Sequence, residues 1–302
     1  MSAYLPTPQA LEEVLRIILP EQYHGCYEDV QAVSMGSAGL KYGPDGKVAW
    51  DRIWTTFCDL AMAGGPPHKG KLLEAGRAAD IEAQPEAYRQ IVEEICYGIG
   101  LAAGLKAESS PSLGWIQIDC ESHAMAGWLT RAIVMENVSA RCHGAVLELP
   151  AGPSYRLEKE VKNVITSAAK TYHYWFEHME AEQHREIANL FARMNITSPL
   201  IQPAWENETA QNELCDKIAR EIQNTTGLRS VDPHPCGWLG LECGHVRLAI
   251  WMMRALSATN AISRREETVL FIPVNASLDP DGNRVTDAVI QIYRFAVARN
   301  IV

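Results

Sequence analysis

The feature that most constrains this chain is an internal repeat. The stretch GWIQIDC, from Gly114 to Cys120, returns as GWLGLEC, from Gly237 to Cys243. At this offset residues 104–150 align with residues 227–273 without a gap, and fourteen positions are identical. About three identities would be expected by chance at ordinary residue frequencies. The sequence therefore predicts two similar halves related by a pseudo-two-fold axis.

The spacing of apolar residues predicts the same order of elements in each half. Because a strand, a helix and a second strand usually form a parallel, right-handed crossover, we expect an α/β fold with short parallel strands. The predicted fold is thus a tandem duplication of a helix-rich α-β-α-β-α unit, preceded by an N-terminal helical segment. The expected elements are helix 85–105, strand 115–120, helix 121–138, strand 145–149 and helix 157–179, then helix 212–225, strand 238–243, helix 246–262, strand 268–272 and helix 284–299.

The domain boundaries follow from the repeat. Residues 1–82 lie outside it, with helices predicted over 8–19 and 48–62 and a GGPPHKG loop after them. Residues 83–195 form the first repeat and residues 196–302 the second. The stretch 181–208 contains two prolines and is expected to connect the halves.

Charge and composition exclude several classes of partner. The 302 residues carry a net charge of -10, and the densest basic pair, Arg264-Arg265, is followed at once by two glutamates, so no nucleic acid is expected. Without a basic leader, or an apolar run long enough to span a membrane, the chain is expected to be cytoplasmic and free of membrane. The eight cysteines form no CxxC and are expected to be reduced thiols. A homo-oligomer is also considered.

Candidate catalytic residues lie at the predicted strand ends. Ligands in open α/β sheets bind beyond the carboxyl ends of the strands, where Cys120, His123, Cys243 and His245 fall. A helix N-terminus next to each cysteine would lower its thiol pKa. The alternative is that both cysteines are small core residues. The histidines do not align: His123 is opposite Val246, and His245 is opposite Ser122.

Repeated arginines are the candidate ligand-binding residues. Arg131 and Arg254 each follow a tryptophan by three residues on a largely apolar helix, so each needs an anionic partner. Asp119 and Glu242 could supply the carboxylates, or the guanidinium groups could bind a carboxylate or phosphate of a ligand. Arg141 and Arg264 are interpreted as residues at helix C-termini.

Two further features of the sequence are candidates for binding. In the GGPPHKG loop, His68 and Lys69 could hold an anion, although the loop has no phosphate-loop spacing. Several close Cys–His pairs could together bind zinc or iron, although no spacing matches a known finger. His173, His178 and His184 are five or six residues apart, so we expect them on different faces of a helix and in solvent.

These patterns predict a small-molecule-binding protein, or an enzyme, acting on a small anionic ligand in a cleft between the two halves. Its ligand-binding residues would be Arg131, Arg254, His68, Lys69, Asp119 and Glu242. The alternatives are a Cys/His metal-binding protein and a structural or oligomerising protein without a small-molecule site. No nucleophile elbow, kinase signature or dinucleotide fingerprint is present, so the sequence names no cofactor.

Overall fold

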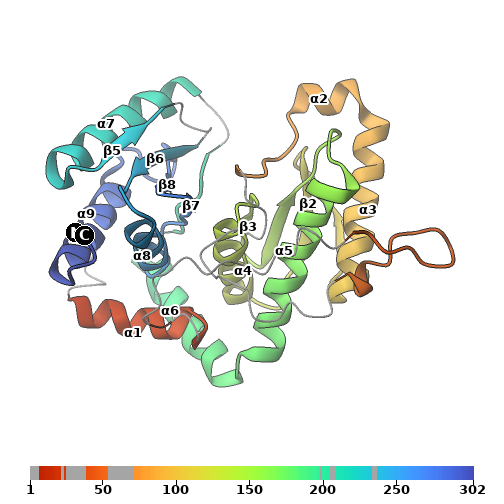
Figure 1. The fold of residues 1–302 in the computed structure, drawn as a ribbon, viewed down its shortest axis with the longest axis horizontal. Helices are drawn as coiled ribbons and strands as arrows, with labels where there is room; N and C mark the ends of the chain where they lie inside the picture. Colours follow the sequence, from red (N-terminus) through yellow and green to blue (C-terminus); the bar gives the residue numbers. More distant parts are fainter. Residues whose placement is uncertain are drawn as a thin grey trace. The chain divides into compact units, whose positions relative to one another are not determined.

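The computed structural model describes residues 7–21, 24, 39–53, 71–197, 199–204, 208–232 and 237–302. The chain divides into two compact units. Unit 1 comprises Met1–Val30 and Asn189–Val302, and unit 2 comprises Gln31–Ala188. Each unit contains a four-stranded sheet with helices packed against it (Figure 1).

In unit 2 the strand order is β1-β2-β4-β3, and every neighbouring pair is antiparallel. Helix α3 contacts β1, helix α4 contacts β3 and β4, and α5 packs on both helices. In chain order the elements are η3 (Trp50–Arg52), α2 (Ala78–Ala83), α3 (Pro85–Ala103), β1 (Ala107–Ser109), β2 (Trp115–Asp119), α4 (His123–Met135), β3 (Arg141–His143), β4 (Val146–Pro150), η5 (Leu157–Val161), α5 (Lys162–His173) and η6 (Tyr174–His178).

In unit 1 the strand order is β5-β6-β8-β7, again antiparallel throughout. Helix α7 contacts β5 and β6, α8 contacts β7 and β8, and α9 packs on both helices. The elements are α1 (Pro8–Ile18), α7 (Glu208–Thr226), β5 (Arg229–Val231), β6 (Trp238–Glu242), α8 (Val246–Ser257), β7 (Arg264–Glu266), β8 (Val269–Pro273) and α9 (Asn283–Ala298); α6 (Ala181–Thr197) begins in unit 2 and ends in unit 1.

The predicted fold class is wrong, because all six pairings between the described strands are antiparallel. The prediction overlooked a short strand between each central helix and the strand that follows it. In unit 2, β3 turns back into β4 through a two-residue turn, so β4 runs antiparallel to its neighbour β2. The crossover through α4 therefore does not join neighbouring strands. The expected duplication of an α-β-α-β-α unit is not what the structure shows.

The glycine before each tryptophan has a steric reason. Gly114 and Gly237 have positive φ values of 87° and 72°, a region that favours glycine. A Cβ at Gly114 would lie 2.6 Å from the carbonyl oxygen of Gly76, and one at Gly237 would lie 2.5 Å from that of Ala204. Each GW pair thus lies where another backbone segment passes too closely for a side chain.

Helix packing buries one face of each sheet. In unit 2, Ile116 and Ile118 of β2 and Leu147 and Leu149 of β4 are essentially inaccessible, as the period-two alternation of a strand requires. Helix α4 is buried on all sides from Ala124 to Met135. Its N-cap residue is Ser122, whose hydroxyl accepts a hydrogen bond from the amide of Met125 at 3.1 Å.

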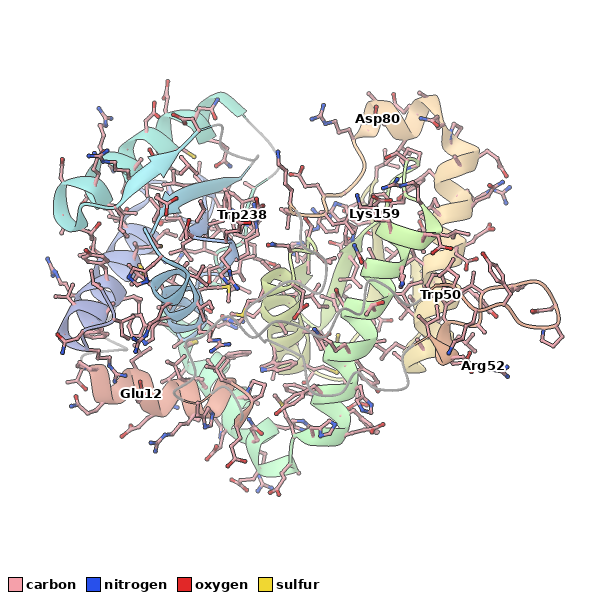
Figure 2. The ribbon with its side chains drawn as sticks, viewed as in Figure 1. Glu12, Trp50, Arg52, Asp80, Lys159 and Trp238 are labelled. Atoms are coloured by element: carbon pink, nitrogen blue, oxygen red, sulfur yellow. The ribbon has the colours of Figure 1, made fainter. Side chains whose placement is uncertain are left out.

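Two local expectations concern segments outside the sheets. The stretch 181–208, expected to connect the halves, contains helix α6, which begins in unit 2 and ends in unit 1. In the region expected to be a helix over 48–62, only the short η3 turn is described, and residues 54–70 lie outside the described part. Trp50 in that turn is completely buried, and its indole nitrogen donates to Glu94 on α3 at 2.7 Å (Figure 2).

Candidate functional site

The end of β2 in unit 2 places three of the predicted residues next to one another. Asp119 is the last residue of the strand, Cys120 follows it, and His123 is the first residue of α4. His123 is exposed beside the Gly144 turn. Cys120 is buried, and its pKa is raised to about 12 by burial first, and then by Cys142 and the carboxylates of Asp119 and Glu121. The expected lowering of this thiol pKa is therefore wrong, because burial and negative neighbours outweigh the helix N-terminus.

The corresponding end of β6 in unit 1 is made of structural contacts. Burial raises the pKa of Cys243 to about 12, and Glu242 adds to the effect. Glu242 accepts hydrogen bonds from the amide of Gly244 at 2.7 Å and from the hydroxyl of Thr268 at 3.3 Å. His245 caps α8: its Nδ1 accepts from the amide of Leu248 at 3.2 Å. This histidine occupies the N-cap position that Ser122 occupies on α4, which explains the mismatch seen in the sequence.

Arg131 and Arg254 lie within their helices and are almost inaccessible, at 2% and 1% exposure. The Arg131 guanidinium donates to the carbonyl oxygen of Gly127, one turn earlier, at 2.9 Å. Burial lowers the pKa of Arg131 to about 10. A ligand arriving from solvent does not reach either side chain without an opening of the helix layer, so a ligand-binding role for them stays a prediction.

The remaining predicted residues, His68 and Lys69, lie outside the described residues. Among the residues that the structure describes, no group of three His, Cys, Asp or Glu side chains is placed to hold a metal ion. No helix in the described part of the chain is long and apolar enough to cross a membrane.

The sequence interpretation missed a row of side chains across the unit 2 sheet. Cross-strand partners share a face, and the register places Glu108, Gln117, Glu148 and Arg141 in one line over β1, β2, β4 and β3. We call these four residues the unit 2 row; they lie on the face opposite the buried isoleucines and leucines. Gln117 donates to Glu108 at 2.8 Å, and Arg141 Nε donates to Glu148 at 2.6 Å.

Arg141 is held on two sides within this row. Its guanidinium carbon lies 4.3 Å from the ring centroid of Trp115, and its Nε is bonded to Glu148. Glu148 also accepts from the hydroxyl of Ser110. Within the described part of the chain the guanidinium donates through Nε alone, so its two Nη groups remain available. The side chain of Arg141 is 20% exposed, whereas that of Glu148 is only 6% exposed.

His143 is the second basic side chain on this face. It lies two residues after Arg141 on β3, and its Nε2 is 3.7 Å from Oε2 of Glu148. At 70% exposure it projects into solvent. A signal for this pair was present in the sequence: RCH and VLEL alternate around Gly144, which is typical of a tight hairpin. The interpretation of Arg141 as a helix C-terminal residue is wrong, because Arg141 is the first residue of strand β3.

The corresponding positions of unit 1 have different chemistry. The register aligns Val231, Gly240, Phe271 and Arg264, which we call the unit 1 row. The Arg264 guanidinium lies 3.9 Å from the centroid of Phe271 and 5.1 Å from that of Trp238, and its Nη1 donates to Glu266 at 2.6 Å. Arg264 is completely buried, as is Trp238, which Figure 2 labels.

Comparison with protein-family models, with curated proteins and with solved structures gives no match for this chain.

Proposed function

We propose that this protein binds a small molecule bearing a carboxylate or phosphate group, and that Arg141 in unit 2 is the principal contact. The supporting observation is that Trp115 and Glu148 orient this guanidinium while its side chain stays partly exposed. Among the described residues, neither of its Nη groups donates a hydrogen bond. A planar guanidinium held in place forms two parallel hydrogen bonds to such anions with little loss of side-chain freedom.

His143 supports the same proposal as a second contact. It projects from the same strand and the same face as Arg141, one alternation further along. In its neutral form the imidazole can donate one hydrogen bond to an anion, and in its protonated form it adds a positive charge. Two basic groups at this spacing offset the negative charge of Glu148, which otherwise opposes an anion.

The proposal is for binding rather than thiol chemistry. With a pKa of about 12, the thiols of Cys120 and Cys243 stay protonated near neutral pH, and a thiol is a far weaker nucleophile than a thiolate.

We further propose a cytoplasmic location, no nucleic-acid or membrane partner, and a homo-oligomer as an arrangement to test. These rest on the sequence arguments above.

The test is calorimetric titration of the purified protein with inorganic phosphate and with citrate at pH 7. We expect Arg141→Met to weaken binding at least tenfold, because the charge and both Nη donors are lost. The matched control is Arg156→Met, which removes an exposed arginine paired with Glu160 in the same unit. No measurable binding of either anion by the wild-type protein, or equal loss in both variants, would overturn the proposal.

A further inference from the structure

The π-helical turn η6, at the end of α5, brings two histidines into contact. The ring centroids of His173 and His178 are 5.3 Å apart, with the rings at 73° to each other. In an α-helix, residues five apart point in directions about 140° apart. A π-helix bonds each residue to the fifth one before it, so residues five apart lie on one face. The expectation that these histidines lie on different faces is therefore wrong, because this turn is not α-helical.

Aromatic contacts tie this turn to two further helices. Tyr174 stacks on His178, with centroids 5.5 Å apart, and on Trp128 of α4, with centroids 6.1 Å apart. Trp175 stacks on His184 of α6, with ring centroids 4.3 Å apart and an angle of 10° between the ring planes. Nε2 of His184 is 2.9 Å from the carbonyl oxygen of Trp175, so this nitrogen carries a proton and donates. The turn is thus a junction between α4, α5 and the start of α6.

The charges around the junction are unevenly distributed between the two rings. Oε1 of Glu177 lies 3.0 Å from Nδ1 of His173, which gives that imidazole an anionic partner. His178 is exposed, and its ring contacts are with His173 and Tyr174. The other titratable or charged groups on the elements that pack here are His123, Arg131 and the capping Glu136 on α4, Lys162, Lys170 and Tyr172 on α5, and Glu180, Glu182, His184, Arg185, Glu186 and Arg193 at and along α6.

Several of these groups are already engaged. Lys170 pairs with Glu136 at 2.8 Å in a fully buried ion pair, and Arg185 pairs with Glu182. Among the described residues, Glu177 places a carboxylate against His173, whereas no ion pair joins a carboxylate to His178. A second positive charge on His178 would face the first at ring-contact distance.

We propose that this turn, residues 173–178, is an acid-sensitive switch in which His178 is the moving part. Histidine is the side chain that ordinarily gains a proton between pH 8 and 5. When both imidazoles are charged they repel, and His173 is retained by Glu177 while His178 leaves its place against Tyr174. His184 keeps its contact, because an imidazolium still donates from Nε2 and stacks favourably on Trp175.

The proposal is tested by near-ultraviolet circular dichroism of the full chain between pH 7.5 and 5.5. We expect the aromatic signal to change over this range while the far-ultraviolet signal stays constant. His178→Gln should abolish the change, whereas His184→Gln and the exposed control His123→Gln should retain it. A constant aromatic signal in the wild-type protein, or a change that persists in His178→Gln, would contradict the switch.

A second measurement does not depend on any variant folding. Proton nuclear Overhauser contacts between the rings of His173 and His178 should be present at pH 7.5 and lost at pH 5.5. Persistence of these contacts at pH 5.5 overturns the proposal.

Discussion

The two sheets share a strand order and a tryptophan–arginine contact, yet the rows beside that contact differ. In unit 2 the row is polar: Gln117 and Glu148 lie between Glu108 and Arg141. In unit 1 the same register holds Val231, Gly240 and Phe271 before Arg264. An arginine at this position of the sheet is therefore not by itself accessible to a ligand.

What changes is the accessibility of the guanidinium. Phe271 packs on the guanidinium of Arg264, which is inaccessible. Glu148 instead accepts a hydrogen bond from Nε of Arg141, and the side chain of Arg141 remains 20% exposed. Gly240 allows this closure in unit 1, because a Cβ there would lie 2.5 Å from Val231 and 3.0 Å from Phe271. We therefore propose that the ligand binds in unit 2, and we interpret the unit 1 row as packing.

The largest expected effect comes from giving unit 1 the glutamine of unit 2. Gly240→Gln should lower the free energy of unfolding by about 3 kcal/mol, because the side chain overpacks Val231 and Phe271 and buries an amide. The reverse change, Gln117→Gly, should lower it by only about 1 kcal/mol. Urea denaturation monitored by circular dichroism measures both values, and equal losses would contradict the difference in packing.

A second expected effect, which concerns both units, is a loss of stability at alkaline pH caused by their buried thiols. Burial raises the pKa of Cys120 and of Cys243 from 9.0 to about 12, so the unfolded chain releases these protons first. The stability that these thiols contribute is present below pH 9 and is lost as pH rises from 9 toward 12. At pH 10.5 the loss should be about 2 kcal/mol for each thiol.

Urea denaturation at pH 8 and at pH 10.5 checks this expectation. Compared with wild type, Cys120→Ala and Cys243→Ala should each show a smaller difference between the two pH values. The control is Val138→Ala, which shortens a fully buried side chain that carries no titrating group and should keep the wild-type pH difference. An unchanged pH difference in both strand-end variants would show that these thiols titrate normally.

Within the unit 2 row, replacing the buried carboxylate should lower the free energy of unfolding more than replacing the exposed one. Glu148→Gln should lower the free energy of unfolding by about 1.5 kcal/mol, because the charged hydrogen bond to Arg141 is lost at a nearly buried position. Glu108→Gln, at an exposed side chain, should change it by less than about 0.5 kcal/mol. Thermal denaturation of the two variants makes the comparison, and a larger loss for Glu108→Gln would reverse it.

The smallest effect concerns the turns that precede β4 and β8. Gly144 has a φ of 64°, and the aligned Glu267 has a φ of 51°, which is unfavourable for a residue with a side chain. Glu267→Gly should raise the free energy of unfolding by about 0.5 kcal/mol, and Gly144→Ala should lower it by about 1 kcal/mol. Chemical denaturation of both variants tests the pair, and stabilisation by Gly144→Ala would contradict it.

The sequence predicts the long elements of this fold and fails on the short ones. Helix α3 begins at Pro85, and β2 covers Trp115–Asp119, close to the expected bounds, because apolar periodicity over many residues is a strong signal. Strand β3 has three residues and lies at a sheet edge, so its alternation of polar and apolar side chains is too short to be a strong signal. A prediction without β3 joins β2 and β4 through a single helix, and for that reason expects a parallel pair where the structure has an antiparallel one.

The candidate site depends on that missed strand. Once Arg141 was assigned to a helix end, its contact with Glu148, seven residues later, could not be inferred. The cysteines were located correctly beside the helix starts, but the depth of burial that raises their pKa depends on packing from other elements. The histidine contact at η6 depends on a π-helical turn, which residue spacing does not reveal.

The most direct test of ligand binding in unit 2 compares the two arginines in one sample. In a spectrum of the arginine side-chain Nε–H groups, Arg141 and Arg264 can be assigned with Arg141→Lys and Arg264→Lys. On addition of inorganic phosphate, we expect the Arg141 resonance to move in a saturable way and the Arg264 resonance to stay in place. Movement of Arg264 with a stationary Arg141 would contradict the assignment of binding to the unit 2 row.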